Sequence, residues 1–155
     1  DNTWLHTATD RPLRAIETVK VVGYPNGLWD AVNNSPIART GSTATHPLAR
    51  LDGKSNFLVD AAVFGGSSGS PVFAFEAPMY LLPEGGYAPG TKASLIGILW
   101  GVVEKNTKGS LVMEKIPAST EPSPLVKTPL NLGVAMHAAH LLEIEDIIRG
   151  AKGTS

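Results

Sequence analysis

Glycine and proline divide this chain into short apolar runs, and this division constrains the fold more than any other feature. The 155 residues include 16 Gly and 12 Pro, and these residues fall between apolar segments that are mostly too short for helices of ordinary length. Strands of globular proteins are about five or six residues long, whereas helices average about eleven. The pattern therefore predicts an all-β fold, either a barrel or a sandwich.

Six apolar runs are expected to form the main strands, and a further strand is expected near residues 111–116. The six runs cover residues 18–23, 37–45, 56–63, 71–75, 93–104 and 132–136. The run 93–104 (ASLIGILWGVVE) is too apolar to lie at the edge of a sheet, so we expect neighbours on both sides of it. Segment 76–91 is rich in proline and glycine and is predicted to be a long surface loop.

One helix is expected, over residues 138–149. Leu141, Ile144 and Ile148 recur at helical spacing and form an apolar stripe. Gly150 follows at a position where glycine commonly ends a helix.

Composition excludes several classes of function. Apolar residues make up 43% of the chain and charged residues 17%, which is typical of a soluble globular domain. A net charge of -1 without a basic block argues against a nucleic-acid partner, and no apolar run is long enough to span a membrane. The absence of cysteine excludes a disulfide framework, a thiolate zinc site and a cysteine nucleophile, and we expect neither a cofactor nor a metal. It leaves both the cytoplasm and the periplasm open as compartments.

The run GGSSGSP at residues 65–71 has the features of a loop that presents a nucleophile. A hydroxyl nucleophile needs an exposed turn, backbone N–H groups that can stabilise an oxyanion, and small neighbours that let substrate approach. Here an apolar strand leads into the glycines and serines, and Pro71 opens the next strand. Gly66 can adopt the backbone conformation that turns its N–H toward the same point as the N–H of Ser68.

This run resembles the nucleophile loop of trypsin-like (chymotrypsin-fold) serine proteases, and most closely that of the cysteine-free bacterial branch that includes the HtrA proteases. The resemblance implies that Ser68 is the nucleophile and that the N–H groups of Gly66 and Ser68 form the oxyanion hole. Asp60 matches an aspartate that this branch carries before the serine, and it is a candidate substrate-binding residue. Ser67 stands where the branch commonly has asparagine, and Ser70 stands where a second glycine is usual.

The flanking runs are also similar to this branch. VVGYPNG at residues 21–27 resembles the strand and turn that open the second barrel, and LGVAM at 132–136 resembles its last strand. Leu95-Ile96-Gly97-Ile98 resembles the strand whose edge pairs with the substrate backbone, which makes these four residues candidate substrate-binding residues. The likeness implies a single six-stranded antiparallel Greek-key barrel with a C-terminal helix. The run 23–37 also resembles uncharacterised bacterial trypsin-like peptidases.

The resemblance implies catalytic partners that this sequence does not supply. In the trypsin-like fold the histidine and aspartate come from a first barrel, and residues 1–17 are too few to form one. We therefore expect the C-terminal portion of a serine endopeptidase, with a linker or extension over 1–15, a barrel over 16–150 and a tail over 151–155. Its expected partners are a polypeptide substrate and the missing first barrel, and self-association is possible. His6, which has Asp10 nearby, is the least improbable substitute base.

Three other interpretations compete with this one. A G-x-S-x-G elbow with Ser67 as nucleophile is rejected, because Pro71 continues into a strand rather than a helix. A flexible Gly/Ser linker is disfavoured by the apolar strands on both sides of the run. An inactive trypsin-like barrel that binds peptides or acts as a scaffold remains the alternative. Glu17 and Asp30 are expected to be solvated surface charges.

Overall fold

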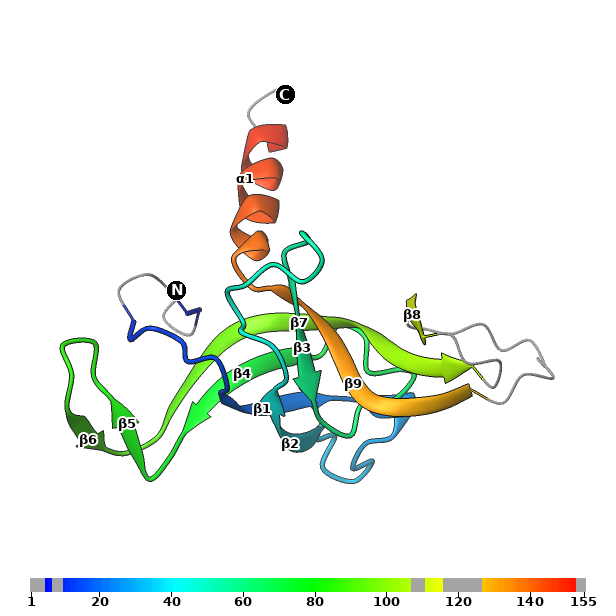
Figure 1. Cartoon of the computed structure of the whole chain (residues 1–155), viewed down its shortest axis with the longest axis horizontal. Helices are drawn as coiled ribbons and strands as arrows, with labels where there is room; N and C mark the ends of the chain where they lie inside the picture. Colours follow the sequence, from blue (N-terminus) through cyan, green and yellow to red (C-terminus); the bar gives the residue numbers. More distant parts are fainter. Residues whose placement is uncertain (1–4, 7–9, 107–110, 116–126, 153–155) are drawn as a thin grey trace.

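The computed structural model describes residues 5–6, 10–106, 111–115 and 127–152, and its core is a closed antiparallel barrel of six strands (Figure 1). Each barrel strand is hydrogen-bonded to two neighbours, and β4 closes the ring by pairing with both β1 and β7. The predicted all-β single barrel is therefore confirmed. Around the ring the strands are β1 (Thr18–Gly23), β2 (Ile37–Thr43), β3 (Asn56–Asp60), β9 (Lys127–His137), β7 (Lys92–Asn106) and β4 (Pro71–Glu76).

Alternation of buried and exposed side chains builds the core. In β1, Val19 and Val21 point into the barrel, and in β4 the same holds for Val72 and Ala74, as expected for strands with one face toward the core. Strand β7 contacts β4, β8 and β9, which confirms that it lies in the interior of the sheet. Strand β8 (Leu111–Lys115) extends the sheet beside the second half of β7.

The segment predicted to be a plain surface loop contains a small hairpin. Strands β5 (Met79–Leu81) and β6 (Tyr87–Pro89) pair with each other in a separate two-stranded sheet. The loop prediction was wrong here because each strand has only three residues, too few to show an alternating pattern among the prolines and glycines.

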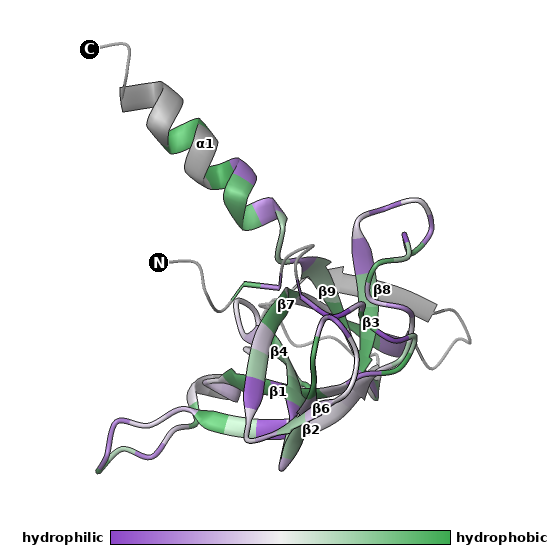
Figure 2. Cartoon of the chain, turned by 90° about the vertical axis from the view of Figure 1, so that its left-hand side faces the viewer, coloured by the Kyte–Doolittle hydropathy of each residue, from purple (hydrophilic) through white to green (hydrophobic). Residues whose placement is uncertain are grey.

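Helix α1 (His140–Lys152) projects away from the barrel (Figures 1 and 2). Of the predicted stripe, Leu141 packs against Leu5, Leu95 and Ala138, whereas Ile144 and Ile148 are about half exposed. The predicted C-cap at Gly150 was wrong because the helix continues through this residue to Lys152. None of the helices in the described part of the chain combines the length and apolar composition that crossing a bilayer requires.

The N-terminal segment packs on one end of the barrel through a buried ionic cluster. The Arg11 guanidinium donates to both Glu17 carboxylate oxygens, at 2.7 and 2.8 Å, and to Glu76 Oε2 at 2.9 Å. Arg11 and Glu17 are each only 3% exposed, so the prediction of Glu17 as a solvated charge was wrong. Burial alone would raise the pKa of Glu17, but hydrogen bonds from Arg11 and from the Arg14 N–H outweigh it and lower the pKa.

Candidate functional site

The loop between β3 and β4 ends in two consecutive tight turns. The Ser67 N–H donates to the Phe64 carbonyl oxygen at 3.1 Å, and the Ser70 N–H donates to the Ser67 carbonyl oxygen at 3.2 Å. The third residue of each turn is a glycine with a left-handed backbone, Gly66 at φ 83° and Gly69 at φ 84°. A positive φ at this position is the mark of a type II turn, which favours glycine over any residue with a Cβ. The glycine spacing of the sequence therefore dictates the path of the loop.

The two turns place three serines in different environments. Ser67 and Ser70 are buried, with 4% and 5% exposure, whereas Ser68 is exposed. The Ser67 hydroxyl is close to the Phe64 N–H, at 3.4 Å. Of the three hydroxyl groups, that of Ser68 is therefore presented to solvent, from a loop that connects two strands.

The loop is held against β7 on the side that follows Ser68. The Gly69 N–H donates to the Leu99 carbonyl oxygen at 2.8 Å, and the Leu99 N–H donates to the Ser70 carbonyl oxygen at 2.9 Å. These bonds fix the backbone directly after Ser68 to the barrel wall. The position of the Ser68 hydroxyl is therefore set by the barrel rather than by a free loop.

Two backbone donors beside the Ser68 hydroxyl have no internal acceptor. Within the described residues, the N–H groups of Gly66 and Ser68 make no hydrogen bond to the chain. Backbone N–H groups without an internal partner are free to bind a ligand oxygen. The site therefore contains a hydroxyl and the two N–H groups that the sequence predicted for an oxyanion hole.

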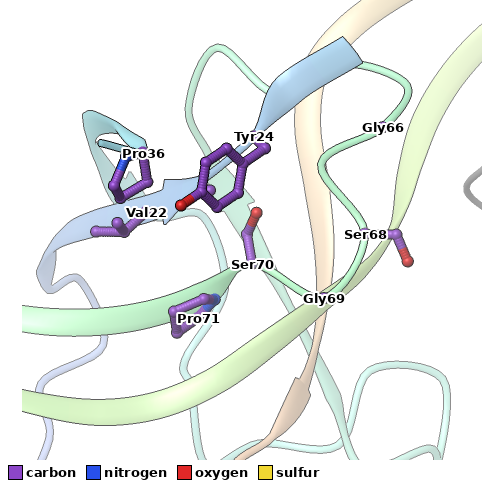
Figure 3. Close-up of a pocket in the computed structure, with 9 residues that line it drawn as sticks. Val22, Tyr24, Pro36, Gly66, Ser68, Gly69, Ser70 and Pro71 are labelled. Atoms are coloured by element: carbon purple, nitrogen blue, oxygen red, sulfur yellow. The ribbon is translucent and has the colours of Figure 1, made fainter. Parts of the chain in front are cut away.

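A pocket of about 370 Å³ flanks the loop (Figure 3). Its walls are apolar or aromatic, and none of its lining residues carries a charge. The Ser70 hydroxyl points toward the Tyr24 ring, whereas the Ser68 side chain points away from that ring, to the outer side of the loop (Figure 3). The lining residues come from β1, from the loop after it and from the serine loop: Val22, Gly23, Tyr24, Pro36, Gly66, Ser68, Gly69, Ser70 and Pro71.

The β1–β2 loop, which forms one wall of this pocket, was not recognised from sequence as part of the site. The Asp30 carboxylate accepts hydrogen bonds from the N–H groups of Val32 and Asn33 and from the Asn33 side-chain amide. The Asn33 bonds lower the pKa of Asp30. The signal available in the sequence was Asp30 followed three residues later by Asn33, which is typical of an Asx-type turn.

The other predicted binding residues lie outside this pocket. Asp60 is exposed at the end of β3, where it pairs with β2 and β9. Leu95, Ile96 and Gly97 are buried in the barrel wall, and Leu95, Gly97 and Ile98 are paired with β4. Their opposite edge bonds to His6, Ala138 and β9. The structure brings Gly66 and Ser68 together and places Asp60 and residues 95–98 elsewhere.

None of the four histidines lines the pocket beside Ser68. The His6 N–H donates to the Leu95 carbonyl oxygen, whereas the serine loop is bonded to Leu99, four residues further along β7. This spacing separates the two by about 13 Å along the strand. His46 Nδ1 accepts from the Leu48 N–H, His140 Nδ1 lies 2.9 Å from Glu143, and the His137 ring packs edge-on against Phe57.

Burial disfavours the protonated form of two histidines at the end of the barrel opposite Ser68. It is the main cause that lowers the pKa of His6 and the pKa of His137. Among the described residues, no group of three or more His, Asp or Glu side chains could hold a metal ion. The chemistry available at the site is therefore argued from Ser68 and the two N–H groups.

Comparisons with known proteins add no assignment. No family model, curated protein or solved structure matches the chain. The functional argument therefore rests on the loop, the pocket and the barrel that positions them.

Proposed function

We propose that this barrel carries the nucleophile of a trypsin-like serine endopeptidase, which hydrolyses peptide bonds through an acyl-enzyme on Ser68. The observation that carries the proposal is the exposed Ser68 hydroxyl in a loop fixed by two glycine turns, beside two N–H groups without an internal acceptor. This combination supplies the attacking atom and the donors that acyl transfer requires.

The reaction proceeds in two steps in this proposal. The Ser68 oxygen attacks the peptide carbonyl carbon while its proton passes to a general base, and the N–H groups of Gly66 and Ser68 donate to the oxyanion that forms. The C–N bond then breaks, the leaving amine takes the proton from the base, and the acyl group remains on Ser68. Water adds to the acyl group in the second step and releases the acid and the free serine.

The general base and its carboxylate partner come, in this proposal, from a first barrel outside the described residues. Support comes from the side of the site, where no histidine lines the pocket and the Ser68 side chain faces outward (Figure 3). A packed partner barrel would also cover large apolar side chains that are exposed on the β1–β2 loop and at Phe64. These side chains are Tyr24, Leu28, Trp29, Val32 and Phe64.

The alternative is an inactive trypsin-like barrel that binds peptides or acts as a scaffold. It is favoured by the absence of a histidine from the pocket beside Ser68. The two functions differ in one measurable property, since only the enzyme needs the Ser68 hydroxyl to cleave a peptide.

Cleavage of unfolded casein tests the proposal, with the longest natural polypeptide that contains these residues and with its Ser68→Ala variant. We expect Ser68→Ala to lower kcat on the order of 10⁶-fold, because it removes the nucleophile. Ser35→Ala, at an exposed serine of the β1–β2 loop, is the control and leaves kcat unchanged. The 155-residue chain alone is expected to show at most residual turnover. Full activity of Ser68→Ala would contradict the enzyme function.

A further inference from the structure

The pocket beside Ser68 contains one buried polar group that no protein atom satisfies. Ser70 is 5% exposed, and its hydroxyl is directed into the pocket toward Tyr24 (Figure 3). The Ser70 N–H and C=O groups bond to Ser67 and Leu99, but the side-chain oxygen makes no hydrogen bond to any of the described residues. A hydroxyl that is buried without a partner destabilises the fold, so it marks a place where a ligand can supply the missing bond.

The chain makes room for this hydroxyl at a specific position. A β-carbon built on Gly23 would collide with the Ser70 oxygen and would lie 3.1 Å from the Ser70 β-carbon. The Ser70 side chain therefore occupies the space that any larger residue at position 23 would need. The serine, which stands where a glycine is usual in the resembling family, is accommodated by a glycine on the facing strand β1.

The remaining walls determine what kind of group the pocket favours. Val22, Tyr24, Pro36 and Pro71 present apolar or aromatic surface, and no charged residue lines the pocket. A charged group would lose its hydration there without meeting an opposite charge, which disfavours it strongly. An aromatic group would gain contact with the Tyr24 ring and the two prolines.

We propose that this pocket is a specificity pocket that binds a neutral substrate side chain with an apolar body and a hydrogen-bonding tip, as in tyrosine, and that Ser70 Oγ bonds to this tip. The inference deepens the proposed function and rests on it for the identity of the ligand as part of a peptide. Ser68 and Gly66 line the same pocket, so the bound side chain belongs to a residue adjacent to the scissile bond. Ser70 is a specificity-determining residue in this account, and Ser68 is the nucleophile.

Small aromatic molecules test the pocket without any bond cleavage. The amide resonances of the ¹⁵N-labelled chain are followed by NMR during titration with p-cresol and with toluene, which differ by one hydroxyl. We expect both molecules to shift the resonances of Gly23, Gly69 and Ser70, and p-cresol to bind about fivefold more tightly, the effect of one net hydrogen bond. Benzylammonium, the cationic analogue, is expected to bind more weakly than toluene.

Two variants assign the preference to the Ser70 oxygen. Ser70→Ala and Ser70→Gly each remove this oxygen, and both are expected to bind p-cresol and toluene with equal affinity while their spectra show a folded barrel. Equal affinities in the unchanged protein, a preference that survives in both variants, or shifts confined to residues outside the pocket would overturn the inference. An inactive Ser68 would leave these results unchanged, so failure of the pocket and failure of the proposed enzyme function are distinguishable.

Discussion

The two ends of the barrel use polar side chains in opposite ways. At the end where the N-terminal segment packs, the Arg11 guanidinium is bonded to Glu17, Glu76 and the Pro12 carbonyl oxygen. At the other end, the Ser70 oxygen and the N–H groups of Gly66 and Ser68 have no partner among the described residues.

The difference separates groups that stabilise the fold from groups that are available to a ligand. Natural proteins satisfy almost all buried polar groups, and departures from this rule concentrate at functional sites. The Arg11 cluster follows the rule because its geometry brings opposite charges within 3 Å of each other in a buried place. The serine loop departs from it, and the predictions below test whether the two ends differ as this account requires.

The largest expected effect is on the free energy of unfolding, at the satisfied end. Arg11→Ala leaves the buried Glu17 carboxylate without its counter-charge, and we expect a loss of about 3–5 kcal/mol. Arg14→Ala is the matched control, since Arg14 is exposed and meets Glu76 at 3.2 Å. It is expected to cost less than about 1 kcal/mol. Urea denaturation measures both, and equal losses would remove the distinction between a buried cluster and a surface pair.

A smaller effect is expected at the unsatisfied end, from Gly23→Ala. The added methyl group collides with the Ser70 oxygen, and overpacking of this kind costs about 1–3 kcal/mol. Ser70→Gly in the same chain removes the collision, so the double variant is expected to regain most of the lost stability. Urea denaturation of the four proteins in a double-mutant cycle gives the coupling energy. Additive effects would show that Gly23 and Ser70 do not share the space inferred here.

The smallest expected effect concerns His137, whose Nε2 atom is an unsatisfied exception near the satisfied end. Burial, with smaller contributions from His140 and Arg50, lowers its pKa below the ordinary 6.5, so the unfolded chain binds the proton first as the pH falls. The histidine's contribution to the free energy of unfolding is therefore fully present above about pH 6.5 and is lost as the pH falls below it.

The His137→Phe variant keeps a ring in contact with Phe57 and removes the titrating group. We expect its free energy of unfolding to fall less steeply than that of the unchanged protein between pH 7.5 and pH 5, a comparison made by urea denaturation at each pH. His6, whose pKa is also lowered by burial, retains its part of the slope. Identical slopes in the two proteins would contradict the assignment to His137.

The barrel strands were predictable because their residues alternate or form uninterrupted apolar runs. The glycine spacing around Ser68 was equally informative, because left-handed turns leave few other choices of residue at positions 66 and 69. The expected exposure of Ser68 followed from the same turns.

Features that depend on distant pairs could not be predicted. The burial of Glu17 depends on Glu76 and Arg11 meeting at one end of the barrel. The space for Ser70 depends on Gly23, which lies 47 positions earlier and is adjacent only after β1 pairs with β4. The pocket itself requires the β1–β2 loop to lie beside the serine loop, which no local pattern indicates.

Mapping the site of covalent labelling by a fluorophosphonate tests the central claim most directly. The longest natural polypeptide containing these residues is treated with the reagent, and mass spectrometry locates the adduct. The account predicts a phosphonyl group on Ser68, absent from Ser68→Ala and retained in Ser35→Ala. An unlabelled Ser68, under conditions in which a reference serine hydrolase is fully labelled, would contradict it.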